Sequence, residues 1–384
     1  MMITEGAGEL NPAAHAAAVL PRPVSVGPRA IVPVILTATA SEAAGARMRV
    51  GGLRVVDRAI RQLGRLRDVH AVIASDGSVH IPSRLPRNME VREIDGDADA
   101  AVQRLRDELG ADAIVVQADT VWVQPSRFDR GTRVVDAASR RAAEGVVFRE
   151  AQRDTVGIVD RLLNQKIASR LTQLFLVHLP VAPALVTLIA GFVGLYGALM
   201  VAGGTWQSVL SGFAILEGYA ILDGCAGELG RVRLHQTALG AWLDTVVGDF
   251  VNVMMVLAVG LALWRHGGTY LDMKTALAAA VMTVFYAGVS YRELVRQGEG
   301  DVMKLRWWFA YGQSLRYMSG AGSSSMRAVM LLGRRDFVIV LALALAYFEQ
   351  TWVMLVYMMI IAIVRAGVAL GQLFTPEWRI RPPL

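Results

Sequence analysis

The sequence predicts two parts of different fold class: an α/β domain with a mainly parallel sheet, then an all-α domain of six transmembrane helices. Hydrophobic residues make up 54% of the chain and the mean hydropathy is +0.41, which is too apolar for an ordinary soluble protein. Most of the charge lies in residues 1–175. Residues 178–375 contain several apolar runs that are long enough to cross a bilayer, which takes about 20 residues.

The N-terminal segment and the cysteine content indicate where the chain resides. Residues 1–30 are rich in Ala, Pro and Gly and lack a basic start followed by an apolar core, so we expect a disordered tail and no signal peptide. Cys225 is the single cysteine, which excludes an intrachain disulfide and fits a protein that faces the cytoplasm.

Residues 31–150 alternate between strand and helix patterns. β-branched runs predict buried strands, and apolar residues at helical spacing predict the helices between them. This alternation is typical of an α/β domain with parallel strands. The predicted strands are 30–38, 69–75 and 111–123, and the predicted helices are 53–66 and 97–110.

Residues 155–177 form a predicted amphipathic helix. Arg161, Lys166 and Arg170 interrupt a series of leucines and isoleucines at helical spacing. Such a helix can lie in the membrane interface, and a helix that packs as a linker between two domains is an equal alternative on the sequence alone.

The membrane domain is predicted over 178–375, followed by a short tail at 376–384. The loops at 225–237 and 292–335 are rich in arginine, which places them in the cytoplasm. Six spans then put both termini and the α/β domain on the cytoplasmic side of an inner membrane. The predicted spans are 181–202, 206–224, 238–264, 271–291, 336–350 and 352–373.

The net charge of +6 indicates a type of partner. Cations beside membrane spans usually set topology and contact anionic lipid headgroups, so we expect membrane lipid as a partner and no nucleic acid.

A group of chemistry-bearing residues lies on the second and third spans. Asp223, Gly227 and Arg231 follow at four-residue steps, and Gly240 and Asp244 repeat that step. Ionisable residues at the rim of a membrane helix are functional candidates, because they are costly there. Facing carboxylates can bind a divalent cation, an arginine can clamp a phosphate, and glycine lets a bulky ligand approach the backbone.

This spacing resembles the signature of the CDP-alcohol phosphotransferases, DxxDGxxARx8GxxxDxxxD. Ala226 and Gly248 stand where the signature has its second and fourth aspartates. The amino-acid sequence around the motif is most similar to that of the branch of the family that uses inositol phosphates. The resemblance covers about 155–375, and includes "APALVT" at 182–187 and "GRRDF" at 333–337.

The resemblance implies a function and roles for individual residues. Asp223 and Asp244 would bind Mg²⁺ or Mn²⁺, and Gly227, Arg231 and Gly240 would shape the CDP site. The protein would transfer a phospho-alcohol from a CDP-activated donor to an alcohol or lipid acceptor and release CMP, in phospholipid or phospho-polyol synthesis. A homodimer is the assembly expected from the resemblance.

The two replaced aspartates leave a second interpretation open. Neither Ala226 nor Gly248 can bind a metal or accept a proton through its side chain. Asp249 follows Gly248 directly and is the candidate substitute base. Loss of a general base costs roughly 10²–10⁴-fold in rate. The alternative is therefore a pseudoenzyme that binds nucleotide or lipid, or pairs with an active homologue.

Residues 31–150 resemble the sugar-nucleotidyltransferase fold, which is found fused ahead of the membrane domain in the inositol-phosphate branch. Asp119, in "VVQADTVW" at 115–122, matches the acidic end of that fold's metal-binding strand. The loop at 36–49 has one glycine where a glycine-rich loop would hold a triphosphate on backbone amides. We therefore expect a degenerate domain without nucleotidyl transfer.

One further cation lies inside a predicted span. Arg365 is a candidate contact for a phosphate or a lipid headgroup. The structural alternative pairs it with Asp336 or with a backbone carbonyl.

Overall fold

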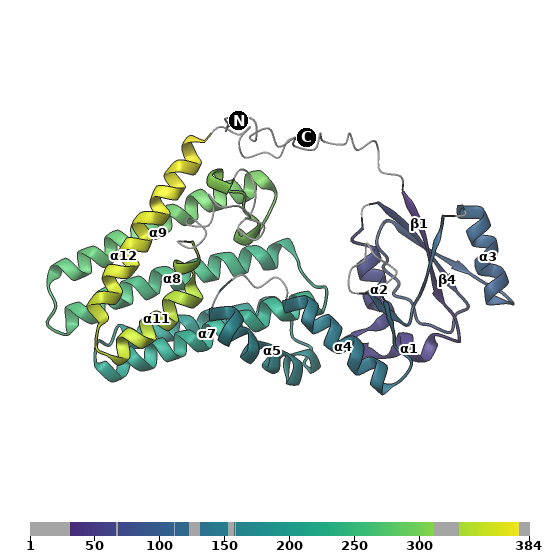
Figure 1. Ribbon diagram of the computed structural model, residues 1–384, viewed down its shortest axis with the longest axis horizontal. Coiled ribbons are helices and arrows are strands. Elements are labelled where there is room, and N and C mark those ends of the chain that lie inside the picture. The colour runs from purple at the N-terminus through teal and green to yellow at the C-terminus, as the bar shows by residue number, and fades with distance from the viewer. Residues whose placement is uncertain are drawn as a thin grey trace, which may run out of the picture.

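The chain folds into an α/β part and a helical part, which lie at opposite ends of the molecule with α4 and α5 between them (Figure 1). The computed structural model describes residues 31–66, 68–110, 112–122, 131–152, 157, 159–310 and 330–375. The predicted tails at 1–30 and 376–384 lie outside the described residues.

A four-stranded parallel sheet forms the centre of the α/β part, in the order β5-β4-β1-β6. Two short antiparallel strand pairs accompany it, β2-β3 and β7-β8. These elements confirm the prediction of an α/β domain with a parallel sheet. The strands are β1 Val32–Ala38, β2 Arg49–Val50, β3 Leu53–Arg54, β4 Val69–Ser75, β5 Met89–Glu93, β6 Ile114–Gln117, β7 Thr120–Trp122 and β8 Gly131–Arg133.

Helices cover both faces of this sheet, as a parallel sheet requires. Side chains of α2 pack with Val34 and Leu36 on one face, and side chains of α3 pack with Ile35 on the other. Successive residues of β1 therefore belong to two separate cores, because side chains alternate across a strand. The helices of this part are α1 Ala43–Arg47, α2 Val55–Leu63, α3 Ala98–Leu109 and α4 Ala137–Gln152.

Five helices in the described residues are long and apolar enough to cross a membrane, namely α6, α7, α8, α9 and α12. The predicted fifth span corresponds to α11, whose 13 residues extend only about 20 Å. The count of six spans therefore remains a prediction. The bounds are α6 Pro183–Val201, α7 Trp206–Val232, α8 Ala238–Arg265, α9 Tyr270–Gln297, α11 Arg335–Tyr347 and α12 Thr351–Phe374, with short turns η4 Val302–Lys304 and η5 Trp308–Ala310.

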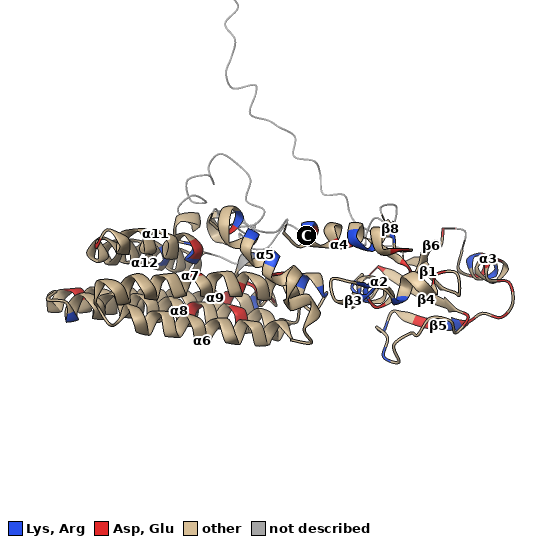
Figure 2. Ribbon diagram, turned by 90° about the horizontal axis from the view of Figure 1, so that it is seen from below, with Lys and Arg blue, Asp and Glu red and all other residues tan. Residues whose placement is uncertain are grey.

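The surface and interior of the helical part are those of a membrane protein. Large apolar side chains such as Phe192, Val281 and Ile360 are exposed, and the helices carry no charge over most of their length (Figure 2). Small residues let helices approach closely: a Cβ on Gly197 of α6 would lie 3.0 Å from the carbonyl oxygen of Gly212 on α7. Such contacts are common between membrane helices.

The segment predicted as one amphipathic helix is divided into η2 Asp160–Asn164, α5 Gln165–Leu174 and η3 Leu176–His178. Residues 155, 156 and 158 of this segment lie outside the described residues. Asn164, Ser169 and Thr172 are buried, whereas Leu162 and Leu174 are exposed. A buried polar side with an exposed apolar side favours the interpretation of an interfacial helix over that of a linker.

Arginines of the α/β part bind the end of α7. Three guanidinium groups along α2 and just after it donate hydrogen bonds to consecutive backbone carbonyls, which lack partners within α7 because the helix ends there. This contact fixes the α/β part against the helical part. The bonds run from Arg58 Nη2 to Val232 O (2.6 Å), from Arg61 Nη1 to Arg233 O (3.0 Å) and from Arg65 Nη2 to Leu234 O (2.8 Å).

Candidate functional site

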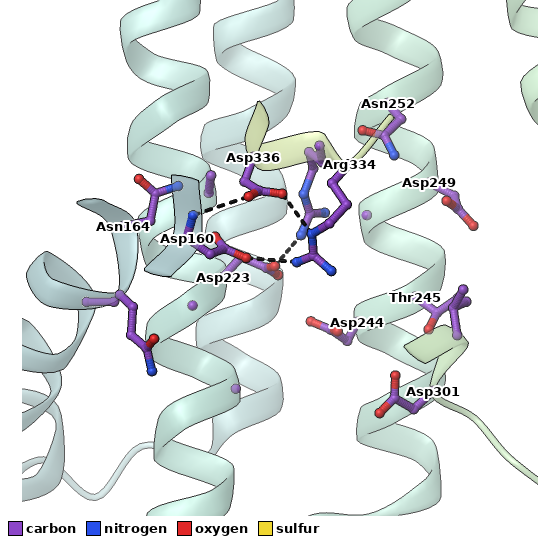
Figure 3. A pocket seen from close by; sticks show the side chains of 18 of the residues that line it. Asp160, Asn164, Asp223, Asp244, Thr245, Asp249, Asn252, Asp301, Arg334 and Asp336 are labelled. Atoms are coloured by element: carbon purple, nitrogen blue, oxygen red, sulfur yellow. Dashed lines mark hydrogen bonds and ion pairs between the residues drawn. The ribbon is translucent and has the colours of Figure 1, made fainter. Parts of the chain in front are cut away.

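A cavity of about 350 Å³ opens between α7, α8, η2 and the start of α11 (Figure 3). It collects most of the residues that the sequence singled out, although they come from different helices. Gly240 does not line the cavity: it lies in the first turn of α8, where its N–H donates to Thr237 Oγ1 at 3.0 Å. The predicted residues that line the cavity are Asp223, Gly227 and Arg231 from α7 and Asp244, Gly248 and Asp249 from α8.

An arginine from α11 occupies the centre of this arrangement. Arg335 forms an ion pair with Asp223 and a hydrogen bond with the hydroxyl of Tyr219. Its guanidinium lies 4.8 Å from the centre of the Tyr219 ring, in cation–π geometry. A Cβ on Gly248 would lie 2.6 Å from Arg335 Nη1. The guanidinium of Arg335 therefore occupies the space beside position 248, where the resemblance places its fourth aspartate.

Position 226, where the resemblance places its second aspartate, has a different environment. Ala226 is buried within an apolar cluster that also includes Val50 and Val147 of the α/β part. It is not among the residues that line the cavity. A carboxylate at this position would face apolar side chains of the other domain, which is unfavourable for a charge.

Arg334 forms a second set of ion pairs at the same cavity. Its guanidinium contacts Asp160 at 2.8 Å and Asp336 at 3.0 Å, and Asp336 also accepts a hydrogen bond from the backbone N–H of Asp160. Burial raises the pKa of Asp160, and the charge of Asp336 adds to this effect while Arg334 opposes it. These contacts join η2 to the start of α11. The sequence analysis noted Arg334 and Asp336 as part of "GRRDF", but it did not indicate that Asp160 is their partner.

Asp249, the candidate substitute base, lines the cavity but lies on the other side of α8 from Asp244 (Figure 3). Its Oδ2 accepts a hydrogen bond from the hydroxyl of Tyr291 on α9 at 2.9 Å. This bond occupies one of the several acceptor sites of the carboxylate. Its role as a base stays a prediction.

Arg365 also lines the cavity, and it donates a hydrogen bond to the backbone carbonyl of Gly333. Its guanidinium lies 5.4 Å from the centre of the Tyr286 ring. The backbone carbonyl, rather than Asp336, is therefore the partner of this arginine inside α12.

The described residues do not fit the two-metal centre that the resemblance implies. They contain no group of three or more His, Cys, Asp or Glu side chains placed to hold one metal ion. Asp223 is already paired with Arg335, and two of the four carboxylates are absent at positions 226 and 248. A fixed guanidinium beside Asp223 also repels a divalent cation.

The overall charge of the cavity limits the ligands that it can accept. Seven carboxyl groups and four guanidinium groups line it. Two of the guanidinium groups, those of Arg334 and Arg335, are paired with carboxylates. A bare diphosphate would therefore meet a surplus of negative charge, and a diphosphate that arrives with its own cation is favoured.

The α/β part repeats the pairing of an aspartate with an arginine. Asp119 follows β6, is 1% exposed and accepts a hydrogen bond at 2.8 Å from Arg133 on β8. A Cβ on Gly45 of α1 would lie 2.7 Å from Asp119 Cβ, so the segment after β1 packs directly on this aspartate. Asp119 is thus enclosed in an ion pair at the position that the resemblance assigns to a metal ligand.

Comparison with known proteins adds no family to these observations. No family model matches the chain, and no curated protein matches it. The fold and the cavity define a protein with a parallel-sheet α/β part and five helices that can cross a membrane.

Proposed function

We propose that this chain is a membrane protein of the CDP-alcohol phosphotransferase type whose cavity binds a CDP-activated alcohol without transferring it. The observation that carries this proposal is the ion pair between Arg335 and Asp223, in the space beside Gly248. The ligand would be a CDP-alcohol, accompanied by Mg²⁺ from solution because of the acidic surplus in the cavity.

The chemistry of the site supports binding over turnover. Two-metal transfer depends on cations that stabilise the attacking and the leaving oxygen. Arg335 is a fixed monocation already bound to a carboxylate, and Gly248 provides no base. Gly227 and Arg231 lie together at one wall of the cavity, where a Cβ on Gly227 would be 3.3 Å from Arg231 Nη1 and Arg231 Nε donates to the carbonyl of Ala151 at 2.8 Å. A guanidinium held at this wall suits contact with a phosphate.

Equilibrium binding to the full-length chain in lipid nanodiscs tests this proposal. We expect saturable binding of a CDP-alcohol in the presence of Mg²⁺, weaker binding without it, and no release of CMP over hours. Arg231→Gln should weaken binding about tenfold, because it removes a charged hydrogen-bond donor from the cavity. Arg141→Gln on the exposed side of α4 makes the same change away from the cavity and should leave binding unchanged.

The second candidate function is transfer itself, and the position of Asp244 and Asp249 in one cavity favours it. Under this alternative the purified chain releases CMP from a CDP-alcohol when Mg²⁺ or Mn²⁺ and an alcohol or lipid acceptor are present. Asp244→Asn should abolish that release, whereas Asp107→Asn on α3 should not affect it. Release of CMP with this pattern would replace our first proposal by the second.

A further inference from the structure

A second cavity, of about 400 Å³, lies where the α/β part meets the helical part. Its walls come from the β2-β3 hairpin and α2 on one side, and from residues 177–183 and 233–235 on the other. The hairpin approaches closely: Gly52 has a φ of +77°, and a Cβ there would lie 2.5 Å from the carbonyl oxygen of Val177. This cavity is separate from the one between α7 and α8.

The charged groups in this second cavity all have one sign. Its lining includes three arginines and two histidines, and no Asp or Glu among the described residues. The first cavity has the opposite character, because carboxyl groups outnumber guanidinium groups there. The basic residues are Arg49, Arg61, Arg233, His178 and His235.

None of the three guanidinium groups has a carboxylate partner within the described part of the chain. Arg233 donates to backbone carbonyls of the segment before α6, including Val181 at 2.6 Å and Leu179 at 2.6 Å. Arg61 donates to the carbonyl of Arg233 at 3.0 Å. Carbonyl dipoles hold a guanidinium in place, but they leave its net charge uncompensated.

The arginines of the second cavity also affect one another. Burial lowers the pKa of Arg233, and the nearby charge of Arg49 lowers it further. Like charges that lie together without acidic partners create a positive electrostatic potential, which attracts an anion.

The second cavity lies at the edge of the membrane-spanning helices. It is placed where α6 begins at Pro183 and where α7 ends at Val232, and both helices can cross a membrane. Phe175 and Leu185, close by in the sequence, are large exposed apolar residues. In Figure 2 basic residues appear on both sides of the junction between the two parts. Lipid phosphates occupy this level of a bilayer, and basic residues near it attract them.

We propose that the second cavity is a binding site for a phosphate ester, built jointly by Arg49 and Arg61 of the α/β part and Arg233 of the helical part. The planar fork of a guanidinium matches the oxygens of a phosphate, and Arg49 and Arg61 would supply it. Arg233 would contribute positive charge, because its Nη1 and Nη2 already donate to four backbone carbonyls. The volume is within the range of small-ligand pockets and accepts a phosphate with a glycerol or small polyol attached. This site does not depend on the function proposed for the first cavity.

Binding of three probes to the full-length chain in detergent tests the site. The probes are a short-chain phosphatidylglycerol, a short-chain phosphatidylcholine and inorganic phosphate, each measured by calorimetry at low and high salt. We expect an anionic phosphate to bind, and its affinity to fall as salt rises because the charges are near the surface. Tighter binding of phosphatidylglycerol than of phosphate identifies a lipid headgroup, and equal binding identifies a soluble phosphate ester.

Charge variants link that binding to the second cavity. Arg49→Gln should weaken it about tenfold, and Arg49→Glu should weaken it more. Arg49 is exposed, and its side chain makes no hydrogen bond to the described residues, so this variant should melt at the same temperature as the unmodified chain. Arg61→Gln provides a second variant, and Arg141→Gln is the matched control. Absence of phosphate binding, or affinities within twofold for both Arg49→Gln and Arg61→Gln, would overturn the proposal.

Discussion

The ion pair between Arg335 and Asp223 is the feature whose removal tests the site most directly. Arg335→Met removes the guanidinium, keeps a side chain of similar length and leaves Asp223 without its partner. Removing one member of a buried pair costs about 3–5 kcal/mol, since a buried charge is then uncompensated. The side chains of Arg335 and Asp223 are 24% and 14% exposed, so water reaches them and screens part of that loss. We therefore expect a destabilisation of about 2–3 kcal/mol.

A double-mutant cycle isolates the pair from the effects of each single substitution. Asp223→Asn in the Arg335→Met background removes the unpaired charge and should recover about 1–2 kcal/mol. Thermal unfolding of the full chain in detergent, followed by tryptophan fluorescence, provides the measurement. For a domain of this size the single variant should lower the melting temperature by about 5–10 °C.

The exposed ion pair between Arg92 and Glu108 is a matched control for this cycle. It joins the same kinds of groups at the surface of the α/β part, and its coupling energy should be below about 1 kcal/mol. Additive effects of Arg335→Met and Asp223→Asn, within about 0.5 kcal/mol, would refute the view that the guanidinium neutralises Asp223.

Three further outcomes follow from the same contacts. Without a CDP-alcohol present, Gly248→Asp combined with Arg335→Met should create Mn²⁺ binding that calorimetry detects, whereas the unmodified chain should show none. Equal Mn²⁺ binding by both under these conditions would contradict the view that Arg335 takes the place of a metal. Arg58→Gln should weaken the contact between the two parts, because buried Arg58 donates to the carbonyls of Val50 and Val232, and faster hydrogen exchange in the β2-β3 hairpin should report it. Burial raises the pKa of Glu42 above 4.5, so the protonated form stabilises the fold at low pH, and this contribution is lost as pH rises through the raised pKa. Glu42→Gln should therefore raise the melting temperature, and this increase should be larger at pH 7.5 than at pH 4.5. An equal increase at both pH values would be the contrary result.

Both parts of the chain pair an arginine with the aspartate that the resemblance assigns to a metal. In the α/β part the pair is Asp119 with Arg133, and in the helical part it is Asp223 with Arg335. Each guanidinium supplies positive charge from the chain itself where the resemblance implies a divalent cation. The two parts have no common fold, and each places a guanidinium beside its aspartate.

Local sequence patterns predicted much of the architecture. The alternation of strand and helix patterns over 31–150 predicted the parallel sheet, because residue periodicity follows directly from the geometry of each element. Long apolar runs predicted the membrane helices for the same reason. The four-residue steps from Asp223 to Arg231 placed these side chains on one face of α7, and they do line one cavity.

The sequence by itself determined these elements and the spacing of the aspartates, because both depend on residues a few positions apart. Only the tertiary structure decided what the aspartates contact. Arg335 lies 112 positions after Asp223, and no local pattern relates them. Likewise, the burial of Ala226 against the α/β part and the cavity shared by Arg49 and Arg233 arise only when the two parts pack. Contacts between distant segments depend on the packing of whole elements, and the charge balance of each cavity follows from that packing.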